Sequence, residues 1–373
     1  MKVICAKDEL IKGLLTVSPI TPSKSSLPVL SNFLFQAQSD KIRLSSTDLE
    51  IAVKCNVKAE IEQEGAITIP TKRFTDIIRE MHDDAQIEIS ADDSNQINIK
   101  SGKAKFNLMG IAAAEFPVIP EFPKENNFTV KTDIFASMIK KTSFAASKDP
   151  QRYILNGIYT LIEDETLKMV STDGRRLAYI SVKGIGAKVK AKAIVPTKAV
   201  NDILRLISSE IKAEGIKVGL SENLVAVEFD DIILTSVLIE GLFPNYEQVI
   251  PKKTVFKVEL RTQETLKAVK QMALLTNEKS AADRSSAVKF AFGGNLLTIS
   301  ASTAGLGSGD VEIPIEYKED PIEISFNPAF IKDVLQNMEE EAVSFEFSDA
   351  LNPAIISPQK DKDYLCVVMP MRV

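Results

Sequence analysis

Short segments of alternating apolar and polar residues run along most of the chain. Residues 87–90, 97–100 and 225–229 alternate strictly, which is typical of half-buried β-strands. Turn-forming sequences at residues 92–95 and 163–165 separate such strands. The strands are therefore predicted to pair as antiparallel hairpins.

Six longer segments instead carry apolar residues three and four positions apart, the spacing that gives a helix one apolar face. They are residues 8–17, 72–81, 133–144, 198–207, 262–275 and 328–338. A few helices among many antiparallel strands predict an α+β fold, in which the helices cover one face of each sheet.

Three segments share one arrangement: a short apolar strand, a Pro or Asn, and a helix that ends in Asp and two aliphatic residues. They are residues 67–79, 193–205 and 324–335, and their aspartates lie 126 and 131 residues apart. Because this period is too long for a solenoid, we predict three tandem domains of one kind, each with two helices packed on antiparallel sheets. Their predicted bounds are residues 1–125, 126–253 and 254–373.

Two shorter motifs keep the same period. Ser46-Thr47-Asp48 returns 125 residues later as Ser171-Thr172-Asp173, and Phe116-Pro117 returns 127 residues later as Phe243-Pro244. Their recurrence supports a tandem of homologous domains.

The composition indicates an ordinary folded protein, with 373 residues, 45% of them apolar, and a net charge of −6. No apolar run approaches the roughly 20 residues of a membrane span, and acidic residues follow Met1 too soon for a signal peptide. Three widely spaced cysteines (Cys5, Cys55 and Cys366) suit a reducing compartment. We therefore expect a cytoplasmic protein that does not enter a membrane.

Sequence signatures of catalysis are almost absent. The single histidine, His82, and the scattered cysteines fit no zinc site, and the sequence contains no glycine-rich phosphate-binding motif. The chain is therefore expected to have no metal, no cofactor and no catalytic residue. One alternative is a hydrolase that uses His82, or Ser137 in a Ser-x-x-Lys sequence.

Charge is unevenly distributed along the chain. The six predicted helices carry a net charge of +3, so the rest of the chain carries −9. Basic helices on an acidic protein could attract a phosphate backbone without reading its sequence. The alternative is that these helix faces are merely solvated and that the tandem domains form a scaffold without affinity for DNA.

Six motifs that span the chain point to one known family. They are Thr47–Glu50, Arg152–Gly157, Ser171–Ala178, Phe243–Tyr246, Thr276–Lys279 and Val367–Val373. Together with the three-domain organisation, they resemble the bacterial sliding clamp, the β subunit of DNA polymerase III. The resemblance implies a processivity factor, not an enzyme.

The resemblance also implies a head-to-tail homodimer, in which two chains close a ring around duplex DNA. The implied interface residues are Lys103, Lys105, Phe106 and Leu108 on the first domain and Leu274 and Leu275 on the third. The facing segment, Ala304–Glu312, has only two acidic residues, Asp310 and Glu312. We therefore expect apolar contact to dominate this interface.

By the same resemblance, the chain contacts duplex DNA without sequence preference and is opened onto DNA by a clamp loader. The implied DNA-contacting residues are Lys24, Lys72, Arg79, Lys148, Arg152, Tyr153 and Lys198. Such contacts are expected to be weak and to depend strongly on salt.

The last implied site is a cleft between the second and third domains that holds short linear motifs of the replicative polymerase and of other replication and repair proteins. Its residues would be Leu155, Thr172, Gly174, Arg175, Arg176, Leu177, Pro244, Val249, Leu351, Pro353, Val367, Met369, Pro370, Met371 and Arg372. The aliphatic residues are expected to line an apolar trough, the methionines to repack for different ligands, and the arginines to stand at the rim.

Overall fold

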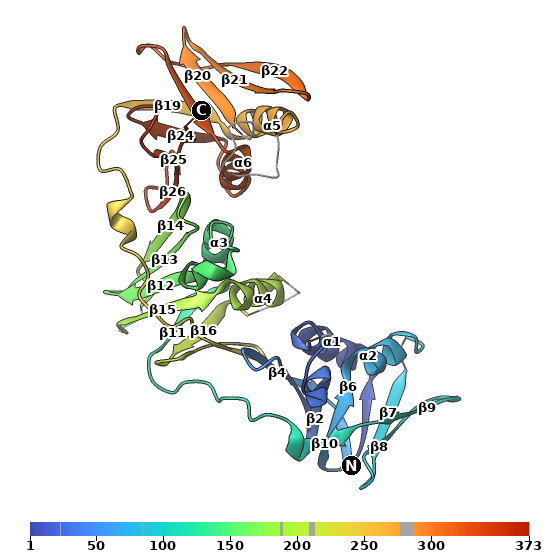
Figure 1. Ribbon diagram of the computed structural model, residues 1–373. Coiled ribbons are helices and arrows are strands. Elements are labelled where there is room, and N and C mark those ends of the chain that lie inside the picture. The colour runs from blue at the N-terminus through green and yellow to red at the C-terminus, as the bar shows by residue number, and fades with distance from the viewer. Residues whose placement is uncertain (23, 84, 187–188, 209–212, 277–286, 373) are drawn as a thin grey trace. The chain divides into compact units, whose positions relative to one another are not determined.

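The computed structural model describes residues 1–22, 24–83, 85–186, 189–208, 213–276 and 287–372, and divides into two compact units (Figure 1). The first unit comprises Met1–Thr132 and Asp202–Leu238, and the second comprises Asp133–Asn201 and Ile239–Val373. The central third of the chain contributes strands to both units. Of the predicted motifs, Asn277–Lys279 and Val373 lie outside the described residues.

All six predicted helices form. They are α1 (Lys7–Val17), α2 (Thr71–Arg79), α3 (Thr132–Ser143), α4 (Thr197–Ser208), α5 (Thr262–Ala273) and α6 (Pro328–Gln336). Three of them end about two residues earlier than predicted. At α6 the reason is local, because Asn337 has φ −101° and ψ 8°, outside the helical region.

The predicted strand-to-helix repeat is confirmed in all three copies. The strands are β6 (Gly65–Pro70), β15 (Ala191–Pro196) and β23 (Ile322–Phe326). In the first two copies the proline is the last residue of the strand, and the helix begins at the next residue. In the third, the Asn327 side chain accepts a 2.9 Å hydrogen bond from the amide of Ala329 and caps α6, while Pro328 fills the first helical position.

The repeated Ser-Thr-Asp motif forms the same tight turn twice. In the first copy, Thr47 Oγ1 donates to the carbonyl of Ile51 at 2.9 Å, and Asp48 Oδ1 accepts from the amides of Glu50 and Ile51. In the second copy, Thr172 Oγ1 donates to the carbonyl of Arg176 at 2.6 Å, and Asp173 Oδ1 accepts from the amides of Arg175 and Arg176. The motif therefore recurs because the turn needs those two side chains.

Two antiparallel sheets make up the first unit. The smaller has the order β5 (Glu60–Gln63), β1 (Lys2–Ala6), β7 (Gln86–Ala91), β8 (Gln96–Ser101) and β9 (Ala104–Met109). The larger has the order β10 (Ile111–Ala112), β6, β2 (Asn32–Gln38), β3 (Lys41–Thr47), β4 (Ile51–Lys58), β18 (Ile232–Val237), β17 (Leu224–Phe229), β16 (Gly215–Leu220) and β11 (Asn127–Lys131). Strands of the first and central thirds thus join at the β4–β18 pair.

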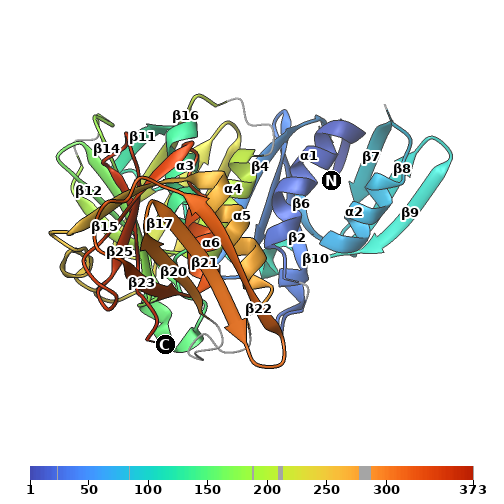
Figure 2. The same ribbon diagram turned by 90° about the horizontal axis from the view of Figure 1, so that it is seen from above.

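Helices α1 and α2 lie side by side in the first unit (Figure 2) and pack against strands of its larger sheet. At Gly13 on α1 the approach is so close that a Cβ atom would lie 2.5 Å from a methyl carbon of Val57. Buried Leu10 and Leu14 on α1 and Phe33 and Phe35 on β2 belong to the core of this unit.

Two antiparallel sheets also make up the second unit. The larger has the order β15, β12 (Gly157–Glu163), β13 (Thr166–Thr172), β14 (Arg176–Lys183), β26 (Tyr364–Val368), β25 (Ala354–Pro358), β24 (Ala342–Phe347) and β19 (Phe256–Arg261). The smaller has the order β22 (Gly307–Pro314), β21 (Leu296–Thr303), β20 (Val288–Gly293) and β23. The β14–β26 pair joins strands of the central and last thirds of the chain.

The core of the second unit is rich in phenylalanine. Phe290, Phe292, Phe326, Phe345 and Phe347 are all buried, with ring centroids 5.0–6.5 Å apart in neighbouring pairs. Such pairs add to the free energy gained by removing the rings from water. Across the described ranges of both units, no helix is long and apolar enough to span a membrane.

Candidate functional site

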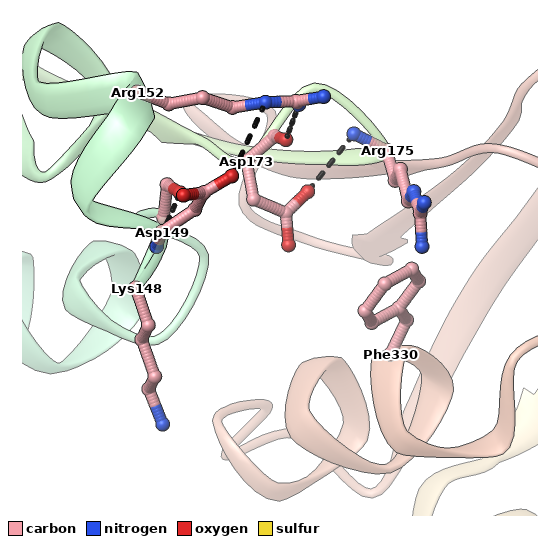
Figure 3. A pocket seen from close by; sticks show the side chains of 7 residues that line it. Lys148, Asp149, Arg152, Asp173, Arg175 and Phe330 are labelled. Carbon is pink, nitrogen blue, oxygen red and sulfur yellow. Dashed lines mark hydrogen bonds and ion pairs between the residues drawn. The ribbon is translucent and has the colours of Figure 1, made fainter. Parts of the chain in front are cut away.

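The turn between β13 and β14 brings predicted cleft residues next to a predicted DNA-contacting residue. Arg152 Nη1 donates to the carbonyl of Asp173 at 2.9 Å, and Arg152 Nε lies 3.9 Å from a carboxylate oxygen of Asp149 (Figure 3). Gly174 has φ +85°, in the region that favours glycine, and a Cβ there would lie 3.0 Å from Arg152 Nη1. Glycine at this position therefore avoids both backbone strain and a close contact with Arg152.

A pocket of about 260 Å³ opens beside this turn (Figure 3). It is lined by Ser147, Lys148, Asp149, Arg152, Asp173, Arg175 and Phe330. Its lining includes three cationic side chains and two carboxylates. The Asp173 carboxylate already accepts hydrogen bonds from two backbone amides of its own turn. The pocket can therefore accept a carboxylate or a carbonyl group, with the Phe330 ring as an apolar wall.

Arg176 was predicted to stand at the rim of the cleft, and this prediction is wrong. Its side chain is 9% exposed, lies 3.0 Å from Asp173 and 2.7 Å from Asp333, and donates to the carbonyl of Phe144. The guanidinium also lies over the rings of Phe144 and Phe330. Because β14 alternates its side chains, Arg176 points away from its neighbour Leu177, so its role is to join Phe144, the residue after α3, to α6.

Leu177 and Val367 form the buried part of the predicted trough. They pair directly across β14 and β26 and pack in one cluster with Val170 and Tyr246. Half-buried Phe243 packs against this cluster, stacked on Tyr159 at 5.1 Å. Burial raises the pKa of Tyr246 to about 12. The segment at residues 243–250 therefore covers the cluster.

Three predicted cleft residues with large apolar side chains are open to solvent: Val249 is 50% exposed, Leu351 61% and Met369 41%. The amide of Met369 donates to the carbonyl of Arg175 at 2.9 Å, which fixes this methionine beside the β13–β14 turn. Of the other residues in the set, Gly174, Arg175, Pro244 and Arg372 are exposed, and Leu155, Thr172, Pro353, Pro370 and Met371 are half-buried.

The predicted DNA-contacting residues are all exposed, and they divide between the two units. Lys24, Lys72 and Arg79 belong to the first unit, and Lys148, Arg152, Tyr153 and Lys198 belong to the second. Lys72 and Arg79 lie in the first and last turns of α2, and Lys198 lies in the first turn of α4. Three of the cations are therefore carried by helices, as the charge distribution predicts.

The predicted interface residues lie at two sheet edges. Lys105, Phe106 and Leu108 are on β9, the terminal strand of its sheet, and Lys103 is in the turn before it. Leu274 and Leu275 follow α5, and a Cβ at Gly309 on β22, also a terminal strand, would lie 3.0 Å from a methyl carbon of Leu275. Leu274 is 80% exposed and Phe106 40%.

Several residues that shape these sites were missed from the sequence. Asp149 lies beside Arg152, Asp333 pairs with Arg176, and Phe330 lines the pocket. Nothing in the local sequence of these three residues indicates such roles. Asp173 could have been found, because its motif repeats. Edge strand β22 was also not predicted, since its glycines are more typical of a loop.

The residues of the hydrolase alternative do not form a site. His82 is exposed after α2, and Ser137 is half-buried on α3. Within the described ranges, no three His, Cys, Asp or Glu side chains are placed to hold a metal ion.

Comparison with known proteins gives one consistent result. Family models for the N-terminal, central and C-terminal domains of the DNA polymerase III beta subunit match residues 1–120, 129–245 and 247–372. The beta sliding clamps of Chlamydia muridarum and Vibrio cholerae are 33% and 32% identical to this chain, and each match covers all of this chain and at least 99% of the relative.

Solved structures agree. The DNA polymerase III beta subunit of Pseudomonas aeruginosa superposes with a TM-score of 0.94 at 30% identity, and the polymerase sliding clamp of Caulobacter crescentus with 0.92 at 30%; both cover the whole of each chain. The predicted fold of three tandem α+β clamp domains is thus confirmed. The hydrolase alternative is wrong, because this family consists of non-catalytic processivity factors. The chain belongs to the bacterial beta sliding clamps, the processivity subunits of DNA polymerase III.

Proposed function

We propose that two copies of this chain join head to tail into a ring that encircles duplex DNA. The observation that carries the proposal is a pair of open sheet edges with exposed apolar side chains. Phe106 and Leu108 lie on terminal strand β9, and Leu274 and Leu275 lie beside terminal strand β22. Open sheet edges with apolar side chains tend to pair with other chains and aggregate unless another strand covers them. Two different edges that meet between subunits give a heterologous contact, which closes a ring if the rotation allows.

The seam in this proposal is held mainly by apolar contact. Lys103 and Lys105 face only Asp310 and Glu312 as possible acidic partners from the 304–312 segment. Exposed ion pairs contribute about 0–1 kcal/mol each, whereas a buried Leu or Phe contributes about 1.5–3 kcal/mol. The leucines and Phe106 therefore dominate the affinity between subunits.

DNA in this ring is held loosely. The seven exposed residues predicted to contact DNA are spread over both units, and none belongs to a base-reading motif. Contacts from Lys and Arg to phosphates release counterions and weaken steeply as salt rises. Such contacts exchange readily, so the closed ring, rather than tight binding, keeps the clamp on DNA while it slides.

The proposed cleft in the second unit receives linear motifs of polymerases and other replication and repair proteins. Val249, Leu351 and Met369 supply exposed apolar surface, and Arg175 with the pocket at Arg152 supplies groups for polar contacts. Burial of a Leu and a Phe side chain gives about 1.5–3 kcal/mol each, so affinity in the micromolar range follows after ordering costs. Met369 can adapt its conformation to different ligands.

We further propose that a clamp loader opens the ring. We also propose that the protein works in the cytoplasm, which the state of its cysteines supports. Cys5, Cys55 and Cys366 are free and buried, and burial raises the pKa of each thiol to about 12. Free thiols of this kind agree with a reducing compartment.

Retention on DNA tests the ring. After loading by a clamp loader, the protein should stay on nicked circular DNA and leave once the circle is cut. Equal loss from both forms would reject encirclement and favour the scaffold alternative. Strong sequence-specific binding at physiological salt would also contradict the proposal.

The interface and the cleft are tested separately. Leu274→Asp with Leu275→Asp should reduce the mass measured by light scattering from a dimer to a monomer, because buried carboxylates would oppose the contact. Met369→Ala should weaken binding of a peptide with a Leu-Phe pair and leave the dimer mass intact. An unchanged mass rejects the interface, and an unchanged peptide affinity rejects the cleft.

A further inference from the structure

The junction between β4 and β18 in the first unit repeats the backbone geometry of the proposed peptide cleft. Ile51 pairs with Ser236 as Arg176 pairs with Val368 in the second unit. The amide of Val237 donates to the carbonyl of Glu50 at 2.9 Å, and the amide of Met369 donates to the carbonyl of Arg175 at the same distance. Val237 and Glu50 therefore occupy the places of Met369 and Arg175.

The equivalence extends to the chain segment before each sheet. Asn32 pairs with Pro70 in the first unit as Gly157 pairs with Pro196 in the second. Counting back five residues from Asn32 and from Gly157 places Leu27 at the position of Arg152. Counting back two residues from the same two positions places Leu30 at the position of Leu155. Phe116 corresponds to Phe243, because both begin the repeated Phe-Pro motif. Leu30 and Phe116 are buried together in one apolar cluster.

Three large apolar side chains at equivalent positions of the first unit are open to solvent. Leu27 is 48% exposed, Leu49 54% and Val237 45%. They occupy the places of Arg152, Gly174 and Met369, where the second unit brings the equivalent residues together at one turn. Single exposed apolar residues are common, but three at the corresponding positions of a binding site form a patch that indicates an interaction.

The backbone at Leu49 gives an independent indication. Leu49 has φ +78°, the conformation that Gly174 adopts without cost at the equivalent position. A leucine held in this region costs free energy, and a side chain that is 54% exposed recovers only part of it by packing in the monomer. Strain of this kind persists at sites where the side chain has a function.

The charge at this junction is opposite to that of the cleft. Glu50 occupies the place of Arg175, is exposed, and makes no ion pair in the described part of the chain. A ligand that reaches this carboxylate would be stabilised by a Lys or Arg side chain, whereas the cleft favours acidic neighbours.

We propose that Leu27, Leu49, Val237 and Glu50 form a second docking site, for a short linear segment of a partner protein that carries a large apolar side chain beside a Lys or Arg. The inference rests on the proposed function in one respect, because the cleft provides its geometric template. The two sites would bind different segments, so one clamp subunit could hold two partners at once.

Two peptides that contain the same Leu-Phe pair test the proposal. One has lysines on either side of the pair and the other has glutamates, and each is titrated into the full-length protein by calorimetry. Leu49→Ser with Val237→Ser should weaken binding of the lysine-flanked peptide about tenfold or more and leave the glutamate-flanked peptide unaffected. Met369→Ala should do the reverse. Leu15→Ser, at a similarly exposed leucine on α1, should affect neither peptide.

Glu50→Arg provides a second variant at an exposed position that does not disturb packing. It should reduce affinity for the lysine-flanked peptide and increase affinity for the glutamate-flanked one. If the lysine-flanked peptide does not bind the protein, or binds both first-unit variants as it binds the parent, the second site is rejected. If only the effect of Met369→Ala is missing, the proposed cleft fails and the second site stands.

Discussion

The guanidinium of Arg176, on β14 of the central third, lies 2.7 Å from the carboxylate of Asp333, on α6 of the last third. Asp173 binds the same guanidinium at 3.0 Å, and the carbonyl of Phe144 accepts a further hydrogen bond from it. One buried arginine thus ties the β13–β14 turn to α6 and to Phe144, the residue after α3.

Replacement of this arginine should destabilise the second unit. Arg176→Ala leaves two partly buried carboxylates without their partner, so we expect a loss of about 2–4 kcal/mol, seen as a lower melting temperature by calorimetry. Arg175→Ala, at the exposed neighbouring residue, should change it little. A double-mutant cycle with Asp333→Asn should give a coupling energy of about 1 kcal/mol or more, and no coupling would contradict this role of the pair.

The two copies of the Ser-Thr-Asp turn should change in stability in opposite directions when the residue after the aspartate is replaced. Gly174→Ala places a Cβ 3.0 Å from Arg152 Nη1 at φ +85°, so it should cost about 1 kcal/mol and weaken peptide binding at the cleft. Leu49→Gly relieves a leucine at φ +78° and should be neutral or stabilising. Thermal unfolding of both variants checks the pair, and equal destabilisation by both would refute the strain argument.

Local patterns predicted the fold well because its elements depend on nearby residues. The six helices follow from their apolar spacing, and the Ser-Thr-Asp turn uses only side chains within five residues. Arg176 shows where such reasoning ends. The four residues before it, Thr172–Arg175, are polar or glycine, and only the pairing of β14 with β26 and the approach of Phe330 and Asp333 bury it. A contact between residues 157 positions apart leaves no local signal.

Edge strand β22 was missed for a related reason. Gly305, in the turn before the strand, and Gly307, its first residue, have positive φ values, and such glycine content is typical of a loop. The strand itself is specified by its pairing with β21, which continues through Gly309. Glycine at position 309 also leaves the space that Leu275 occupies.

Gly309 provides a test of the proposed dimer seam. Gly309→Val should displace Leu275, because even a Cβ would lie 3.0 Å from its methyl carbon, and should raise the dimer dissociation constant about tenfold. Ser308→Val adds the same side chain at an exposed position on the same strand, facing the other side, and serves as the control. Sedimentation at several concentrations measures both. Equal dissociation constants for the two variants would exclude Leu275 from the seam.

The carboxylate of Glu346 predicts an acid-dependent contribution to stability. Burial alone would raise its pKa, but hydrogen bonds from Lys257, Ser344 and Thr254 outweigh burial, so the pKa lies below its ordinary value of 4.5. Since the folded state favours the ionised form, the contribution is complete above the unfolded pKa and is lost as pH falls through the lower folded pKa.

Glu346→Gln should therefore lower stability by about 1–2 kcal/mol at pH 7, and the difference from the parent protein should shrink as the pH falls below about 4. Melting temperatures measured between pH 7 and pH 3 give this difference directly. Glu323→Gln removes an exposed ion pair with Lys289 and should cost less than about 0.5 kcal/mol throughout. A difference for Glu346→Gln that stays constant across this range would mean that the hydrogen bonds do not depend on the charge of the carboxylate, contrary to the lowered pKa.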